Sequence, residues 1–268
     1  LFENGAAGIE ELRLEDQILS LRFFFPSSVS DPEQVFNTTL KQVSIPIPAG
    51  LDLKSIEKKP IQNWQEGWRD FFKPIEIGER FLIRPPWESQ APDRQEIIIH
   101  PGQGFGTGYH ESTHLALLLI EWLYQDQPLR SVCDIGTGSG VLAIATLLLG
   151  ADHVYAIDLE QEALLEVPNN LELSGLDASA VTLVQGGPEV LQVQADLVMA
   201  NIEGHILETL SDDLIGLTNN DGYLLLSGIL TEREDLLLDK FQGRFSLEKT
   251  MRMNEWSGFV LRKTGRSG

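Results

Sequence analysis

Cysteine and long apolar runs are both scarce in this sequence. Its 268 residues include one cysteine, Cys133, so intrachain disulfides and a zinc site built from cysteines are both excluded. The longest apolar run, from Leu115 to Ile120, is far shorter than the roughly 20 apolar residues that span a bilayer. No signal peptide is recognised before the first expected elements. These absences predict a reducing, cytoplasmic setting without a membrane partner.

Basic residues are scarce as well. Lysine and arginine number 20 against 40 aspartates and glutamates, which leaves a formal net charge of −20. Proteins that hold nucleic acid by its phosphates carry a basic surface, so direct nucleic-acid binding is not expected. An acidic protein attracts basic partners at long range, although acidity also serves solubility alone. The charge therefore allows a basic protein partner without requiring one.

The first 90 residues are typical of a small α+β unit without a glycine loop. Residues 1–11 resemble the end of an apolar helix followed by a turn, so this unit is expected to be incomplete at its start. Residues 17–25 predict a strand, because they are rich in β-branched and aromatic side chains. Residues 31–40 predict a short helix that Asp31 caps and that has proline in its first turn.

A stripe of aromatic residues follows. Trp64, Trp68 and Phe71 are four and three residues apart, which places them on one face of a further predicted helix. The stripe is a binding surface in one interpretation and a piece of core in the simpler one. We expect residues 1–60 to form an N-terminal α+β domain, residues 61–95 a linker and residues 96–268 a second domain.

The second domain alternates strands and helices. Strands are expected at residues 131–135, 153–157, 181–185, 195–201 and 223–227, and helices at residues 139–149 and 161–173, between the last two strands and after Thr231. This alternation predicts an α/β fold whose mostly parallel sheet is covered on both faces. Residues 245–252 and 257–262 predict an antiparallel hairpin at the edge of that sheet.

The most informative stretch is a glycine loop after the first of these strands. Gly136, Gly138 and Gly140 alternate with other residues between the strand and an apolar helix. Glycine is required where the chain turns tightly and a ligand approaches the backbone. In an open parallel sheet, the carboxyl ends of the strands are where ligands bind. The loop therefore predicts a nucleotide-type cofactor site.

Two aspartates narrow the choice of cofactor. Asp158 ends the next strand, 22 residues after Gly136, where a carboxylate can accept hydrogen bonds from both ribose hydroxyls. Asp134 precedes the loop, where it would repel a pyrophosphate but attract the sulfonium and amino groups of S-adenosylmethionine. The third glycine also comes one residue early for a dinucleotide fingerprint. The pattern favours S-adenosylmethionine.

Five segments that cover nearly the whole chain carry a resemblance to a known family: residues 64–87, PGQGFGTGYHEST at residues 101–113, residues 134–158, ANIEGHIL at residues 200–207 and LLLSGIL at residues 224–230. They resemble the PrmA methyltransferases, which trimethylate large-subunit ribosomal protein 11 on lysines and on its α-amino group. It implies a class I, Rossmann-like methyltransferase domain preceded by a small domain that recognises the protein substrate. It also implies a cytoplasmic enzyme, which we expect to be monomeric.

The resemblance also implies roles for individual residues. Thr113, Gly136, Asp158 and Asn201 would contact the cofactor, together with Gly138 in the same loop. Phe105 and His110 would lie near the cofactor on the segment before the helix that contains Thr113. No catalytic side chain is assigned, because a desolvated amine can lose its proton to water.

The sequence departs from the family pattern at three places. Tyr109, Glu111 and Ser112 replace the usual threonine, proline and threonine. Glu203 replaces a leucine, and it either orients an incoming ammonium group or is simply an exposed carboxylate at a helix start. Pro168 interrupts the helix after Asp158, which is expected to kink or to begin afresh there.

Three other functions compete with this interpretation. Residues 110–114, HESTH, spell the H-E-x-x-H signature of zinc hydrolases, in which both histidines share one face of a helix. Such a site requires a third ligand, but Tyr124 stands where the third histidine would be, and the carboxylate at the alternative spacing, Asp134, belongs to the glycine loop. His110 also follows a glycine-rich loop, so it is expected to precede the helix. A methyltransferase of another protein or of a small molecule stays open. A non-catalytic module is disfavoured by the intact loop and aspartates.

Overall fold

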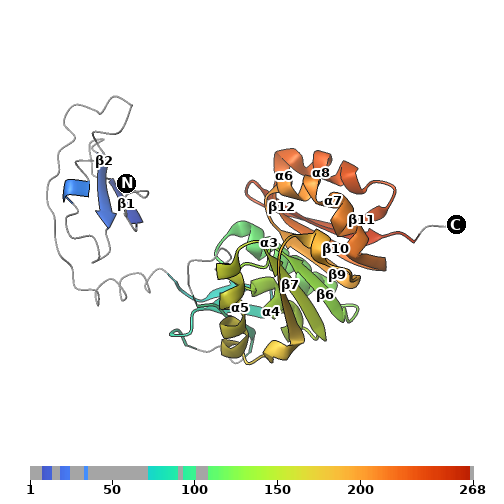
Figure 1. Cartoon of the computed structure of the whole chain (residues 1–268), viewed down its shortest axis with the longest axis horizontal. Coiled ribbons are helices and arrows are strands. Elements are labelled where there is room, and N and C mark those ends of the chain that lie inside the picture. The colour runs from blue at the N-terminus through green and yellow to red at the C-terminus, as the bar shows by residue number, and fades with distance from the viewer. Residues whose placement is uncertain are drawn as a thin grey trace. The chain divides into compact units, whose positions relative to one another are not determined.

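The chain forms two compact units, residues 1–65 and residues 66–268. The computed structural model describes residues 8–13, 19–24, 33–35, 72–89, 93–100 and 108–265. Figure 1 shows the elements of both units in the order of the chain. Each unit has β-sheet structure of its own.

The described part of the first unit is built on an antiparallel strand pair. β1 (Gly8–Arg13) pairs with β2 (Leu19–Phe24), in a register that runs from Gly8 opposite Phe24 to Arg13 opposite Leu19. β2 confirms the strand predicted at residues 17–25. The helix end and turn predicted for residues 1–11 are wrong from residue 8 onward, because pairing with β2 determines the structure there.

Helical structure in the first unit is described only at residues 33–35, within the helix predicted at residues 31–40. The rest of that helix lies outside the described residues. So does the aromatic stripe of Trp64, Trp68 and Phe71.

The second unit contains a seven-stranded sheet, in the order β11-β12-β10-β9-β6-β7-β8. Its strands are β6 (Ser131–Ile135), β7 (His153–Asp158), β8 (Val181–Gln185), β9 (Ala195–Asn201), β10 (Thr218–Leu230), β11 (Phe245–Met253) and β12 (Trp256–Lys263). The pairs among β6 to β10 are parallel, and β12 pairs antiparallel with both β10 and β11. The structure therefore confirms the mostly parallel sheet and its antiparallel hairpin at one edge.

Six α-helices are described in this unit: α3 (Glu111–Leu123), α4 (Val141–Leu148), α5 (Gln161–Leu173), α6 (Gly204–Thr209), α7 (Ser211–Leu217) and α8 (Glu234–Phe241). Short 3-10 helices occupy residues 178–180, 188–190 and 231–233. α5 runs through Pro168 without starting again, so one of the two expectations for that proline is wrong. Among the described residues, no helix has both the length and the apolar character needed to cross a membrane.

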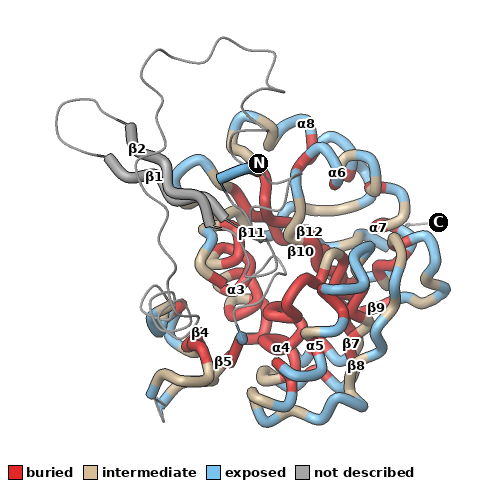
Figure 2. The backbone as a smooth tube through the Cα atoms, turned by 60° about the vertical axis from the view of Figure 1, so that its left-hand side comes forward, coloured by how far each residue is buried: buried red, intermediate tan, exposed pale blue. Residues whose placement is uncertain are grey.

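The core lies on both faces of the sheet. Neighbouring strand residues point to opposite faces, so Val132 belongs to one hydrophobic cluster and Cys133 to the other. The first cluster includes residues of α3 and α4, and the second includes Leu207, Leu214 and Leu237 of α6, α7 and α8. Figure 2 shows the buried backbone concentrated along the central strands and α3. The sheet is thus a central layer covered on both sides.

A second, three-stranded sheet belongs to the same unit. β3 (Ile75–Ile77) pairs antiparallel with β4 (Phe81–Arg84), and β4 pairs parallel with β5 (Gln95–Ile98). Phe81 and Ile83 of β4 are buried in the first hydrophobic cluster. Much of the described part of the expected linker is therefore folded into the second unit.

Candidate functional site

The glycine loop leaves the carboxyl end of β6 and is anchored to the neighbouring strand. The N–H groups of Gly136 and Thr137 donate to the carbonyl of Ile157 in β7, at 2.8 and 2.9 Å. Gly136, Gly138 and Gly140 have φ angles of +70°, +53° and +82°, which L side chains adopt only with strain. A Cβ atom on Gly136 would lie 2.6 Å from Cγ2 of Ile202. The backbone at this turn therefore requires glycine.

Asp158 is brought directly onto this loop. Its Oδ2 accepts a hydrogen bond from the N–H of Gly138 at 2.9 Å, and its Oδ1 accepts one from the N–H of Glu160 at 3.0 Å. The glycine loop after β6 and the aspartate at the end of β7, which the sequence placed in this order, are thus in direct contact. Leu159, which is 71% exposed, follows at the end of β7. Sequence reasoning passed over Leu159, although an apolar residue directly after the acid was visible.

Asp134 lies beneath the loop. Its residue exposure is only 1%, and its Oδ2 accepts a hydrogen bond from the hydroxyl of Thr137 at 2.8 Å. Burial raises the pKa of this carboxyl to about 6, and the hydrogen bond from Thr137 offsets the rise only in part. Among the described residues, its Oδ1 has no hydrogen-bond partner of normal geometry. The carboxyl is therefore held in place under the loop, next to the site.

Asn201 and Thr113 form a hydrogen-bonded pair at the end of β9. The side-chain amide of Asn201, at the end of β9, donates to the hydroxyl of Thr113 in the first turn of α3 at 3.2 Å. Asn201 Oδ1 is buried and has no partner within the described part of the chain. Ser227 lies opposite Asn201 in β10, and its hydroxyl donates to the carbonyl of Ser112 at 2.7 Å. These bonds hold the start of α3 against the carboxyl ends of β9 and β10.

His110 precedes α3, as the sequence predicted. It is the N-cap residue, and its Nδ1 accepts a hydrogen bond from the N–H of Ser112. Its ring lies edge-on to Trp256 with centroids 4.8 Å apart, a neighbour that sequence reasoning missed because the two are far apart in the chain. His110 therefore lies before α3 rather than within it, unlike the first histidine of a helical H-E-x-x-H site. Within the described ranges, no group of three or more His, Cys, Asp or Glu side chains could hold a metal ion.

Three further residues named in the sequence analysis have no described contact with the glycine loop or with Asn201. Phe105 lies outside the described residues. Tyr109 contacts the start of the second unit, because its hydroxyl donates to the carbonyl of Lys73 at 2.6 Å and its ring meets that of Phe72. Glu203 is the N-cap residue of α6 without a side-chain capping bond, and its side chain is 76% exposed.

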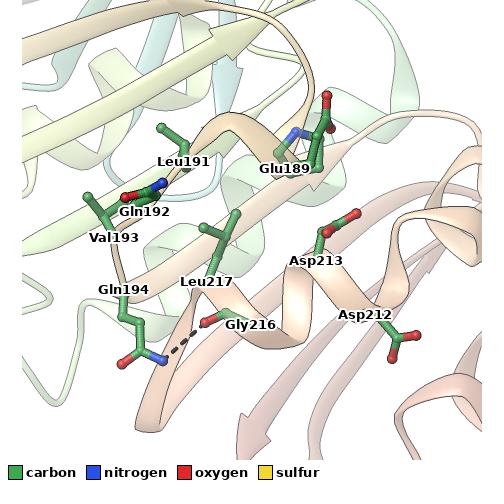
Figure 3. A pocket seen from close by; sticks show the side chains of 10 residues that line it. Glu189, Leu191, Gln192, Val193, Gln194, Asp212, Asp213, Gly216 and Leu217 are labelled. Atoms are coloured by element: carbon green, nitrogen blue, oxygen red, sulfur yellow. Dashed lines mark hydrogen bonds between the residues drawn. The ribbon is translucent and has the colours of Figure 1, made fainter.

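A surface hollow of about 590 Å³ lies elsewhere in the second unit. Figure 3 shows that it is lined by the segment before β9 and by α7, with Gln194 bonded to the carbonyl of Gly216. None of the residues of the candidate site lines it. Gln194 precedes the amino end of β9 and Asn201 ends the strand, so the hollow and the candidate site lie at opposite ends of β9. The hollow is therefore separate from the site.

Comparisons with known proteins agree with this geometry. The model of the family "Ribosomal protein L11 methyltransferase (PrmA)" matches residues 9–264. A ribosomal protein L11 methyltransferase of Syntrophotalea carbinolica is 36% identical over 277 residues, which covers 95% of this chain and 89% of the relative. One from Streptococcus pyogenes is 34% identical and covers 93% of this chain and 80% of the relative.

A solved structure is also similar. The crystal structure of a ribosomal protein L11 methylase from Lactobacillus delbrueckii subsp. bulgaricus is 32% identical and has a TM-score of 0.67. The match covers 72% of this chain and 100% of that one.

Proposed function

Because this chain belongs to the ribosomal protein L11 methyltransferase family, we propose that it transfers methyl groups from S-adenosylmethionine to lysine side chains and to the N-terminal amine of ribosomal protein L11. The observation that carries the proposal is the meeting of the glycine loop with Asp158. Asn201 ends β9, which pairs with the strand before the loop, and it bonds there to Thr113 in the first turn of α3.

The residues at this end of the sheet fit S-adenosylmethionine. Asp158 offers carboxylate oxygens to ribose hydroxyls, and Leu159 beside it offers exposed apolar surface to the base. The Asp134 carboxyl lies beneath the loop and the Asn201 Oδ1 has no partner within the described residues, which suits a ligand that brings an ammonium group and a positive sulfur. The glycine loop, with Gly136 and Gly138, exposes backbone rather than side chains to the ligand. When bound, S-adenosylmethionine supplies the reactive methyl group.

The protein's own contribution is to position and desolvate the acceptor amine. A lysine with a pKa near 10.4 is protonated at neutral pH and must lose that proton before it can attack. An apolar environment lowers the pKa of an amine, and water can carry the proton away. Holding the reactants in line about 3 Å apart then removes orientational entropy from the barrier. Glu203, which is exposed and lies two residues after Asn201 in the sequence, attracts the incoming ammonium group by its charge.

The first unit would recognise the protein substrate. None of the proposed cofactor residues falls within residues 1–65, which form a compact unit of their own. The net charge of −20 favours encounter with a basic ribosomal protein. Residues 66–268 would then be the methyltransferase unit.

Calorimetric titration with S-adenosylmethionine tests the proposal, with methyl transfer to purified ribosomal protein L11 and a zinc assay alongside. We expect saturable binding that Asp158→Ala weakens at least tenfold. The matched control is Asp152→Ala, because Asp152 is an exposed aspartate beside the opposite end of β7. Binding without transfer to L11 would indicate another acceptor. Stoichiometric zinc without cofactor binding would contradict the proposal and favour the HESTH segment.

A further inference from the structure

One face of α5 presents two polar side chains to an unpaired strand edge. β5 is the last strand of the three-stranded sheet, so one row of its backbone groups has no strand partner. The N–H of Ile98 donates to the hydroxyl of Ser174 at 2.9 Å, and the N–H of His100 donates to Oδ1 of Asn170 at 3.0 Å. Asn170 and Ser174 are four residues apart and so lie one turn apart along the same face. Together they accept hydrogen bonds from the N–H groups of Ile98, the last residue of β5, and of His100 just beyond it.

Asn170 makes a further bond that Ser174 does not make. Its Nδ2 donates at 2.9 Å to the carbonyl of Ser139, which lies between Gly138 and Gly140 in the glycine loop. Asn170 is 0% exposed and Ser139 is 1% exposed. A buried donor or acceptor that loses its partner carries the full cost of its desolvation. One buried amide therefore joins the glycine loop to the end of β5.

The two segments that Asn170 joins both lead into the candidate site. His100 directly precedes residues 101–113, which carry the family signature, and Ser139 belongs to the loop that meets Asp158. A primary amide side chain offers both an acceptor and a donor at its end, whereas aspartate lacks the donor and alanine lacks both. Val167 of the same helix also packs there, 3.0 Å from where a Cβ on Gly140 would lie.

We propose that Asn170 is a positioning residue, which fixes the glycine loop in the conformation that binds the cofactor. The inference rests on the proposed function, because it concerns the S-adenosylmethionine site. A loop with three glycines has many conformations available, and ordering it on binding would reduce affinity. An anchored loop has already lost that entropy, so the ligand binds more tightly.

Calorimetric titration of the full chain with S-adenosylmethionine separates this role from simple packing. Asn170→Ala is expected to raise the dissociation constant about tenfold. Ser174→Ala is the matched control, because it removes a hydrogen bond to the same strand from the same helix face but does not touch the loop. We expect Ser174→Ala to change the dissociation constant less than twofold. Asn170→Asp keeps the acceptor for His100 and loses the donor to Ser139, so it should weaken binding as Asn170→Ala does.

Amide hydrogen exchange in the free protein gives a readout that needs no ligand. The Asn170 variants should exchange faster at residues 136–140 while the central strand β6 stays protected, and Ser174→Ala should leave the loop unchanged. Wild-type affinity in both Asn170 variants, or exchange that rises equally throughout the second unit, would overturn the inference. Should Asn170→Ala not fold, Asn170→Asp and its exchange pattern decide alone. Failure of the wild-type protein to bind S-adenosylmethionine would instead overturn the proposed function.

Discussion

At the scale of single residues, the site is determined by glycines whose conformation and surroundings exclude side chains. Gly136 has a φ of +70° and lies against Ile202, whereas Gly175 has a φ of +73° and faces open space. The left-handed conformation costs an L residue about 1–2 kcal/mol in either place. At Gly136 the close contact adds to that cost.

We expect Gly136→Ala to lower the free energy of unfolding more than Gly175→Ala does. Gly175→Ala should cost about 1 kcal/mol, from conformation alone, and Gly136→Ala about 1 kcal/mol more, because Ile202 must move. Urea denaturation of the two variants measures the difference. Equal losses in both would show that the contact with Ile202 is relieved without cost.

Asp134 is the residue whose charge opposes folding. Its folded-state pKa of about 6 lies above the ordinary value of 3.8, so between these pH values the native state binds more protons than the unfolded one. Stability is therefore expected to fall as pH rises from 4 to 6, and the penalty persists above pH 6. A pKa difference of this size between the folded and unfolded states corresponds to roughly 3 kcal/mol.

Denaturation of wild type and Asp134→Asn across this pH range tests that expectation. The variant cannot ionise at this position, so its stability relative to wild type should rise by up to about 3 kcal/mol between pH 4 and pH 7. The change with pH is the readout, since any constant cost of the buried amide cancels. A difference that stays flat would mean that the pKa of Asp134 is close to normal.

At the scale of elements, one lysine side chain connects the C-terminal hairpin to the end of a helix. The ammonium group of Lys263 in β12 donates to the carbonyls of Ile215 and Thr218, at 2.7 and 2.6 Å, where α7 ends and β10 begins. Burial lowers the pKa of Lys263, because its ammonium group is partly removed from water. The hairpin is thereby tied to α7 as well as to β10.

Lys263→Met should lower the free energy of unfolding by about 1–3 kcal/mol, because two carbonyls lose a charged donor. Lys240→Met is the matched control, since Lys240 is exposed in the last turn of α8. We expect its effect to stay within about 0.5 kcal/mol. Similar small effects for both variants in thermal unfolding would mean that water replaces Lys263 at the end of α7.

The sequence predicted the central elements well and the edges less well. β6, β8, β9 and α5 have the predicted bounds, because glycine, proline and acidic residues mark their ends locally. β1 and β3 to β5 were not predicted, since a strand depends on partners that its own residues do not specify. β10 also extends beyond its prediction at both ends, where it pairs with β9 and β12.

Some contacts of the candidate site could be predicted from the sequence and others could not. The glycine loop and Asp158 could be predicted from spacing, because they lie on neighbouring strands of one β-α-β unit. The bond between Thr113 and Asn201 joins residues 88 apart, so only the family resemblance indicated it. Asn170 was missed because a buried asparagine in a helix has the same sequence pattern as a solvated one.

At the scale of the whole molecule, the two units have separable tasks under the proposed function. Residues 66–268 have their own hydrophobic core and contain every described cofactor candidate.

A chain reduced to residues 66–268 should therefore keep its affinity for S-adenosylmethionine within about threefold and lose methyl transfer to ribosomal protein L11. The reason is that every proposed cofactor residue lies within residues 66–268, whereas the proposed recognition unit is residues 1–65. Calorimetry and a transfer assay on the intact and shortened chains measure both. Undiminished transfer by the shortened chain would contradict the assignment of recognition to the first unit.

The position of Ile202 between two glycines limits how this protein can change over generations. A Cβ on Gly136 would meet the Ile202 side chain, whereas a Cβ on Gly228 would lie 2.6 Å from the Ile202 backbone oxygen. A lineage that acquires alanine at position 136 can therefore relieve the close contact, but not the strain of the positive φ, by acquiring a smaller side chain at position 202. No side-chain exchange at position 202 helps an alanine at position 228, because every amino acid has the same backbone. Substitutions at positions 136 and 202 are thus expected to be inherited together, and position 228 to stay glycine alone.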